Sequence, residues 1–233
     1  MESAAVEKSA LALRRLLSFD PECVLESCPD DVMFDAPGVE SIATECAAII
    51  LAQGDEVRAA TLLATGAPLV LLGEAALVDS SVVERLASAH PGKVGIYAPL
   101  SRQAVSWAFE TVSNADFKTV TPSYCEANWE VLKADGSPTG TLAGWWLNAM
   151  RTLGASHFLI TADVRDDTDL NILAGLVEDF GDTLWVGPRE DTVVSLSDWV
   201  SYGQCRQLVL PSAMFAQHDT LFADIPPTSL KAA

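Results

Sequence analysis

Seven short, continuously apolar segments recur along the chain, and amphipathic stretches separate most of them. The segments are residues 32–35, 48–52, 69–73, 94–98, 157–161, 184–187 and 207–210. Runs of this length that are rich in Val, Ile and Leu are typical of strands buried on both faces. Because helical patterns alternate with them, the strands are expected to run parallel in βαβ units.

The intervening stretches carry the marks of helices. We expect helices over residues 53–66, 78–89 and 142–153, and shorter ones over 9–17, 38–47 and 101–112. Asp55 and Glu56 place negative charge in the first turn of one helix, and Gly66 is suited to end it. Over residues 9–17 the leucines follow a helical spacing, which predicts that no strand lies there.

This pattern predicts a closed (β/α)8 barrel, in one domain over residues 1–233, with an atypical first βα unit because no first strand is recognisable. A long insertion is expected after the fifth strand. Within it we predict a β-hairpin or another structured excursion over residues 118–121 and 129–133, and a turn at 135–140. The alternative is a doubly wound open sheet.

Composition narrows the classes of function. The formal charge is −18, from 32 acidic and 14 basic side chains, and such a surface repels nucleic acid and anionic lipid. No apolar run approaches the length of a membrane span, and the N-terminus lacks the pattern of a signal peptide, so we expect a cytoplasmic protein. The five cysteines have no CxxC spacing and are expected to be reduced.

Several motifs resemble a known family, the histidine-biosynthesis barrels that include phosphoribosylformimino-aminoimidazole carboxamide ribotide isomerase. The motifs are ILAQGDEVRAATLLATGA at 50–67, LVLLGEAAL at 69–77, ITADVRDD at 160–167 and DVMFD at 31–35. They are similar to the third and fourth βα units and to the sixth and second strands of that family. The resemblance covers roughly residues 30–212, and it implies a (β/α)8 barrel that acts on a phosphorylated metabolite.

The chain also departs from the family at positions that matter for chemistry. The family binds phosphate with paired glycines after strands seven and eight, where this chain has VGPRE at 186–190 and LPSA at 210–213. Proline removes a backbone donor, and Glu190 would repel a phosphate. The family's strand-five carboxylate is absent, because this strand ends Tyr97-Ala98-Pro99. We therefore predict a divergent member that is not the histidine-pathway isomerase.

Three residues are candidates for catalysis because they end or follow predicted strands. Asp35 is a candidate base or metal ligand, or else a cap for the following helix. Thr161 matches the threonine of the family's sixth strand, although threonine is also a common strand residue. Asp163 shares a loop with Asp166 and Asp167, and such a trio can hold a cation or cap a helix.

Four more residues are candidates for substrate binding. Gln53 and Glu74 follow the third and fourth strands, and Arg189 is the basic residue at the exit of strand seven. Arg189 could hold a phosphate or carboxylate, or pair locally with Glu190. Trp129, within the insertion, is a candidate for a ligand or partner contact. The sequence predicts no cofactor and no bound metal, and His157, which opens a strand, is expected to be structural.

Two functions of different class fit these observations. The first is a divergent isomerase-like or lyase-like barrel acting on a small phosphorylated metabolite, in one-carbon coenzyme biosynthesis by analogy with related barrels. The second is a non-catalytic paralogue that serves as a structural or regulatory subunit of a hetero-oligomer. The missing strand-five carboxylate and the altered phosphate positions favour the second. A homo-oligomer is open in either case.

Overall fold

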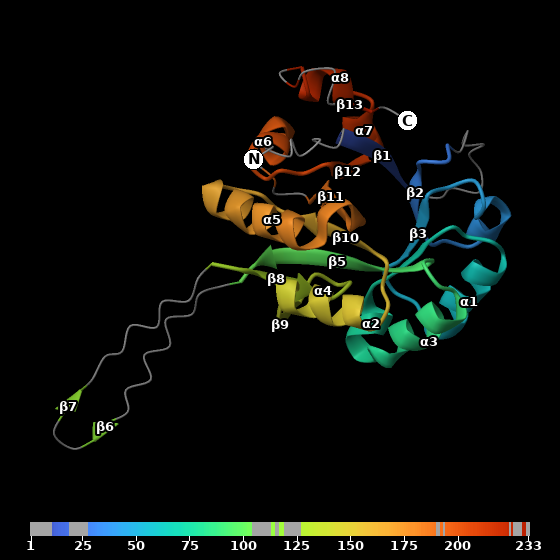
Figure 1. Cartoon of the computed structure of the whole chain (residues 1–233), viewed down its shortest axis with the longest axis horizontal. Coiled ribbons are helices and arrows are strands. Elements are labelled where there is room, and N and C mark those ends of the chain that lie inside the picture. The colour runs from blue at the N-terminus through green and yellow to red at the C-terminus, as the bar shows by residue number, and fades with distance from the viewer. Residues whose placement is uncertain are drawn as a thin grey trace, which may run out of the picture.

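Eight parallel strands form a closed ring in the computed structural model. It describes residues 11–18, 28–103, 113–114, 117–118, 127–189, 192, 194–223, 225 and 230–231. The strands are β1 (Leu11–Ser18), β2 (Val32–Phe34), β3 (Ala48–Leu51), β4 (Val70–Leu72), β5 (Val94–Arg102), β10 (His157–Ala162), β11 (Leu184–Pro188) and β12 (Gln207–Pro211). Each strand pairs with the next, β12 pairs with β1, and β5 pairs with β10, so the ring is closed. The (β/α)8 barrel and all seven predicted strands are confirmed, and the open sheet is excluded (Figure 1).

The first strand lies where the sequence predicted a helix. Residues 9–17 were expected to be helical, but Leu11–Ser18 is strand β1, paired in parallel with β12 and β2. Leu11, Leu13 and Leu17 are buried in the outer core, whereas Leu16 packs with the residues inside the ring. Taken alone, the leucine positions fit the periodicity of a helix or that of a strand. Pairing with two neighbouring strands selects the strand.

Helices follow most of the strands. They are α1 (Glu56–Ala64), α2 (Glu74–Val78), α3 (Ser81–Ala89), α4 (Ala143–Thr152), α5 (Asp167–Phe180), α6 (Leu196–Ser201), α7 (Ser212–Phe215) and α8 (His218–Leu221), with 3-10 turns η1 (Val39–Ile42) and η2 (Gly181–Thr183). Asp55 caps α1 by accepting the backbone N–H of Arg58. The three longer predicted helices are confirmed within a few residues. The one expected over 38–47 is only the short turn η1.

The insertion after β5 differs from its predicted form. Strand β5 continues through Ser101 and Arg102, which were expected to be helical, while residues 104–112 lie outside the described residues. Its end pairs antiparallel with β8 (Trp129–Leu132), and β8 forms a hairpin with β9 (Pro138–Leu142), while residues 119–121 of the predicted hairpin lie outside the described residues. The extended end of β5 provides the edge on which β8 pairs. Two short strands, β6 (Ser113–Asn114) and β7 (Phe117–Lys118), pair with each other, and β13 (Leu230–Lys231) pairs with β1.

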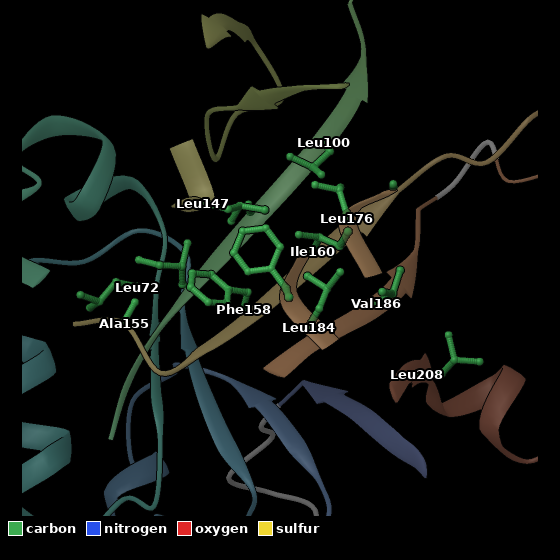
Figure 2. Packing of buried hydrophobic residues seen from close by; sticks show 14 of the residues in the cluster. Leu72, Leu100, Leu147, Ala155, Phe158, Ile160, Leu176, Leu184, Val186 and Leu208 are labelled. Atoms are coloured by element: carbon green, nitrogen blue, oxygen red, sulfur yellow. The ribbon is translucent and has the colours of Figure 1, made fainter. Parts of the chain in front are cut away.

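Two hydrophobic cores follow from the alternation of side chains along each strand. The outer core lies between the strands and the helices, and Figure 2 shows Leu147 of α4 packed near Phe158 and Ile160 of β10. The inner core fills the ring with Val32, Ala48, Ile50, Leu69, Leu71, Leu159, Trp185 and Val209. The barrel interior is therefore packed, and polar groups are left to its two ends. In the described ranges, no helix is both long and apolar enough to cross a membrane.

Candidate functional site

The C-terminal ends of the parallel strands meet at one face of the barrel, which we call the mouth. Thr161 is in β10, and Asp163 follows that strand. Asp35 and Arg189 directly follow β2 and β11. Gln53 and Glu74 lie just beyond β3 and β4. The structure therefore places these six predicted residues at the same end of the barrel, but it divides them among separate environments.

Four polar side chains gather on β5, β10 and β11 near the mouth, and we call them the mouth cluster: Tyr97, Thr161, Asp163 and Arg189. Thr161, Asp163 and Arg189 lie at or just after a strand end, whereas Tyr97 lies within β5, in register with Leu159. Thr161 lies in register with Pro99 on one side and Gly187 on the other. Burial raises the pKa of Tyr97, and the nearby Thr161 hydroxyl and the charge of Arg189 oppose that change.

Asp163 and Arg189 give the mouth cluster its charges. Asp163 is 9% exposed, and its Oδ2 lies 3.8 Å from Arg189 Nη1 and 3.7 Å from Arg165 Nη2. Both separations exceed a direct hydrogen bond but leave a strong Coulomb interaction. Arg189 Nη1 also donates to the carbonyl of Leu100, 3.1 Å away, which fixes the guanidinium beside β5. The result is a positioned cation and a largely buried carboxylate at one site.

Asp35 is held in a different way, at the rim of the barrel. Arg58 of α1 donates from Nε to both oxygens of Asp35, at 3.1 and 3.0 Å, and from Nη2 to Oδ1 at 2.6 Å. Arg58 also pairs with Glu40, and these hydrogen bonds raise the pKa of Arg58. Because both oxygens of Asp35 are engaged, this geometry favours an anchor between the β2 loop and α1 over proton transfer.

Trp129 and the aspartates beyond Asp163 form a structural network. Asp169 is fully buried and accepts hydrogen bonds from Trp129 Nε1 at 2.9 Å, Arg102 Nε at 3.0 Å and the Arg165 backbone N–H at 2.9 Å. Trp129 is itself fully buried, so the structure does not bring its ring to the mouth surface. The network ties β8 of the insertion to the start of α5.

The proposed cation trio of Asp163, Asp166 and Asp167 does not assemble. Asp166 caps α5 and pairs with Arg102, whose hydrogen bond lowers the pKa of Asp166 to about 2. Across the described part of the chain, no three His, Cys, Asp or Glu side chains are grouped to hold a metal ion. Asp166 therefore has the capping role that the sequence left open.

Gln53 and Glu74 line a separate surface cavity of about 490 Å³. It lies among α1, α2 and α3, and it shares no residue with the mouth cluster. Val78 and Val82 supply apolar surface, and Arg85 bonds there to Glu56. Two of the predicted substrate-binding residues are thus grouped together, on the outer rim of the same barrel end.

Sequence reasoning missed Tyr97 and Asp169 as members of these networks. The sequence does carry a signal for Tyr97, since it is the one aromatic residue in the run 94–98. It lies two residues after Gly95 and therefore on the same face of the strand. A Cβ on Gly95 would lie 2.5 Å from the carbonyl oxygen of His157, so glycine permits the close approach of β5 and β10. Asp169 has no comparable signal, because its side-chain partners Trp129 and Arg102 are 40 and 67 residues away in the sequence.

Comparison with known proteins adds no assignment to this geometry. No protein-family model matches the chain, and no curated protein matches it in sequence. The closed parallel barrel agrees with the fold that the motif resemblance implies. The residues at the mouth are therefore the basis for inferring a function.

Proposed function

We propose that the barrel binds a small anionic metabolite at the mouth cluster and acts on it as an isomerase or lyase. The observation that carries this proposal is the convergence of Arg189, Asp163, Thr161 and Tyr97 from three adjacent strands. A positioned arginine in a protein of charge −18 creates a local site for an anionic group. A place in one-carbon coenzyme biosynthesis rests on the family resemblance alone.

The chemistry assigned to each group follows from its type. Arg189 holds a phosphate or carboxylate of the substrate through its guanidinium N–H groups. Tyr97 and Thr161 orient a substrate hydroxyl or carbonyl by hydrogen bonding. Asp163 takes a proton from a substrate carbon or hydroxyl, and then returns it to a different atom, as in an isomerase, or to a departing group, as in a lyase.

The proposed activity differs from that of the histidine-pathway isomerase. That reaction would use two positioned acid–base groups, and β5 presents Tyr97 and Ala98 where the family has a carboxylate. Asp35, which is the other strand-end carboxylate, is bound by Arg58. We expect this protein not to complement a strain that lacks the histidine-pathway isomerase.

Calorimetric titration with inorganic phosphate tests the binding step. We expect weak binding that Arg189→Gln reduces at least tenfold, because the substitution removes the charge that attracts the anion. Arg151→Gln is the control, since Arg151 is an exposed arginine of α4 that bonds to the Asp179 carbonyl. Equal binding by the Arg189 variant and the wild type would overturn the assignment of the anion to the mouth.

The non-catalytic alternative is favoured by one observation. Phe34 and Tyr97 meet edge to face at the mouth, with ring centroids 5.9 Å apart, and they cover the packed interior below. A barrel closed in this way suits a subunit that only supports an active partner. Complete absence of phosphate binding would favour this alternative over an enzyme.

A further inference from the structure

Most of the exposed large hydrophobic side chains of the described residues lie on neighbouring elements of one side of the barrel. They are Val57 of α1, Val78 of α2, Leu142 of β9 and Trp145 of α4, which are 73%, 81%, 38% and 69% exposed. These helices are grouped in Figure 1, away from α6, which is followed by the remaining such residue, Tyr202. Clustered apolar exposure of this kind marks an interaction surface.

A groove of about 510 Å³ lies next to these residues, and we call it the α2–α4 groove. Its lining residues are Ala76, Leu77, Val78, Ser80, Thr141, Trp145, Trp146, Ala149, Met150, Thr152 and Leu153. None of them is charged, although 20% of the chain is. Trp146, Met150 and Ala76 are buried, whereas Trp145 projects into solvent. The same face therefore carries a large apolar projection and a concave, uncharged surface in which apolar side chains lie beside Ser80, Thr141 and Thr152.

Two other hollows of similar size have a different character. The cavity that contains Glu74 also has Asp55, Glu56 and Asp79 along its edge, so four carboxylates face one arginine there, Arg85, which pairs with Glu56 and Asp79. A third, of about 620 Å³ near α5 and α6, is lined by Asp166, Asp167 and Asp198. Two copies of a chain with charge −18 repel each other wherever such carboxylates would meet. Of these three hollows, only the α2–α4 groove offers a face that two copies can bring together without opposing like charges.

We propose that the α2–α4 groove binds a second copy of this chain in a two-fold symmetric dimer, with Trp145 of each copy seated in the groove of the other. A two-fold interface uses the same patch on both copies, so it requires a patch that is complementary to itself. Trp145 beside the groove meets that requirement. Tryptophan is also the residue type most often found as an energetic anchor in interfaces. The proposal is independent of the chemistry at the mouth.

Sedimentation velocity of the full chain over a range of concentrations tests the dimer. We expect a species of twice the 24.8 kDa chain mass. Trp145→Glu should weaken association about 1000-fold, since loss of an anchor of about 2 kcal/mol costs roughly 30-fold and occurs once in each copy. Val78→Glu, on the facing wall of the groove, should also shift the protein to monomer.

Tyr202→Glu is the matched control, because Tyr202 is 68% exposed and lies outside the groove. It adds the same charge as Trp145→Glu but outside the proposed interface. The dissociation constant of the dimer should therefore stay within about threefold of the wild-type value. Raising salt to about 0.5 M should strengthen the wild-type dimer by screening the repulsion between copies. A wild type that stays monomeric at about 100 µM, or a Trp145→Glu variant that still dimerises, would overturn the proposal.

Discussion

The two ends of the barrel interior each hold an arginine, and the surroundings of the two arginines differ. At the N-terminal end, which we call the floor, the Arg14 guanidinium stacks 4.0 Å from the ring centroid of Trp185 and donates to Gln207 Oε1 at 2.7 Å. It forms no ion pair with any described residue, and burial lowers its pKa. At the mouth, Arg189 lies 3.8 Å from Asp163.

The two arginines illustrate a structural role at the floor and a proposed ligand-binding role at the mouth. The floor arginine is surrounded by an aromatic ring and a neutral amide, which hold it in place as part of the core. The mouth arginine lies beside the Asp163 carboxylate, donates to the Leu100 carbonyl and affects the pKa of Tyr97, and we propose that these polar neighbours can exchange contacts with a ligand. Barrel enzymes place stability at the first end and function at the second.

The largest effect is expected from Trp185→Ala at the floor. The ring is 5% exposed and contacts Arg14 and His157, so its removal leaves a cavity and an unsupported charge. We expect the free energy of unfolding to fall by about 4 kcal/mol in urea titration. Phosphate binding by the folded fraction should be unchanged. A variant that loses binding while it remains folded would show that floor and mouth are not separate.

A slightly smaller loss is expected from Asp169→Ala, near the mouth but within the structural network. The substitution leaves the Trp129 indole N–H without its acceptor and removes one carboxylate from Arg102, and we expect a loss of about 3 kcal/mol. Asp167→Ala, at an exposed position in the same helix, should change the free energy of unfolding by less than about 1 kcal/mol. Equal effects of the two substitutions would contradict the network.

A weaker, pH-dependent effect is expected from His157 at the floor. Burial, and then the charge of Arg14, lower the pKa of His157. The folded state thus favours the neutral imidazole, and stability falls as the pH drops below the unfolded value of about 6.5, until the folded pKa is passed. In His157→Gln this part of the decline should disappear from urea titrations at pH 7.5 and 5.5. His90→Gln, at the end of α3, should keep the wild-type decline.

The smallest effect on stability is expected from Asp163→Asn in the mouth cluster. This substitution keeps the volume and removes the charge, and the ion pairs of the carboxylate with Arg165 and Arg189 are longer than direct hydrogen bonds. The melting temperature should change by less than about 3 °C, whereas turnover of any substrate should fall by at least about 100-fold. A large fall in melting temperature would make Asp163 a structural residue.

The strands could be predicted because their apolar runs are continuous, whereas β1 could not. Its sequence places Arg14 and Arg15 among the leucines, and both arginines bond to residues that come later in the sequence: Arg14 to Gln207 and Arg15 to Asp31. The partner of β8 was also beyond prediction, because the end of β5 was expected to be helical. The local sequence of a segment does not determine which distant strand it pairs with.

The placement of the candidate residues at one end of the barrel was predictable, whereas their pairing was not. Strand ends place Thr161, Asp163 and Arg189 together once the barrel is inferred. Which carboxylate is bound by an arginine depends on contacts between elements that are separated in the sequence. Asp35, after β2, and Arg58, in α1, are 23 residues apart. Sequence patterns therefore give the candidates, and only the folded geometry separates anchors from groups available to a ligand.

The most direct test of the mouth as a ligand site is a nuclear magnetic resonance titration of the isotope-labelled protein with inorganic phosphate. We predict that the backbone resonances of Tyr97, Thr161 and Arg189 shift with one common saturation curve, whereas those of Ala12 and Gln207 at the floor do not move. Shifts confined to the floor, or no shift at the mouth at concentrations of about 20 mM, would contradict the account.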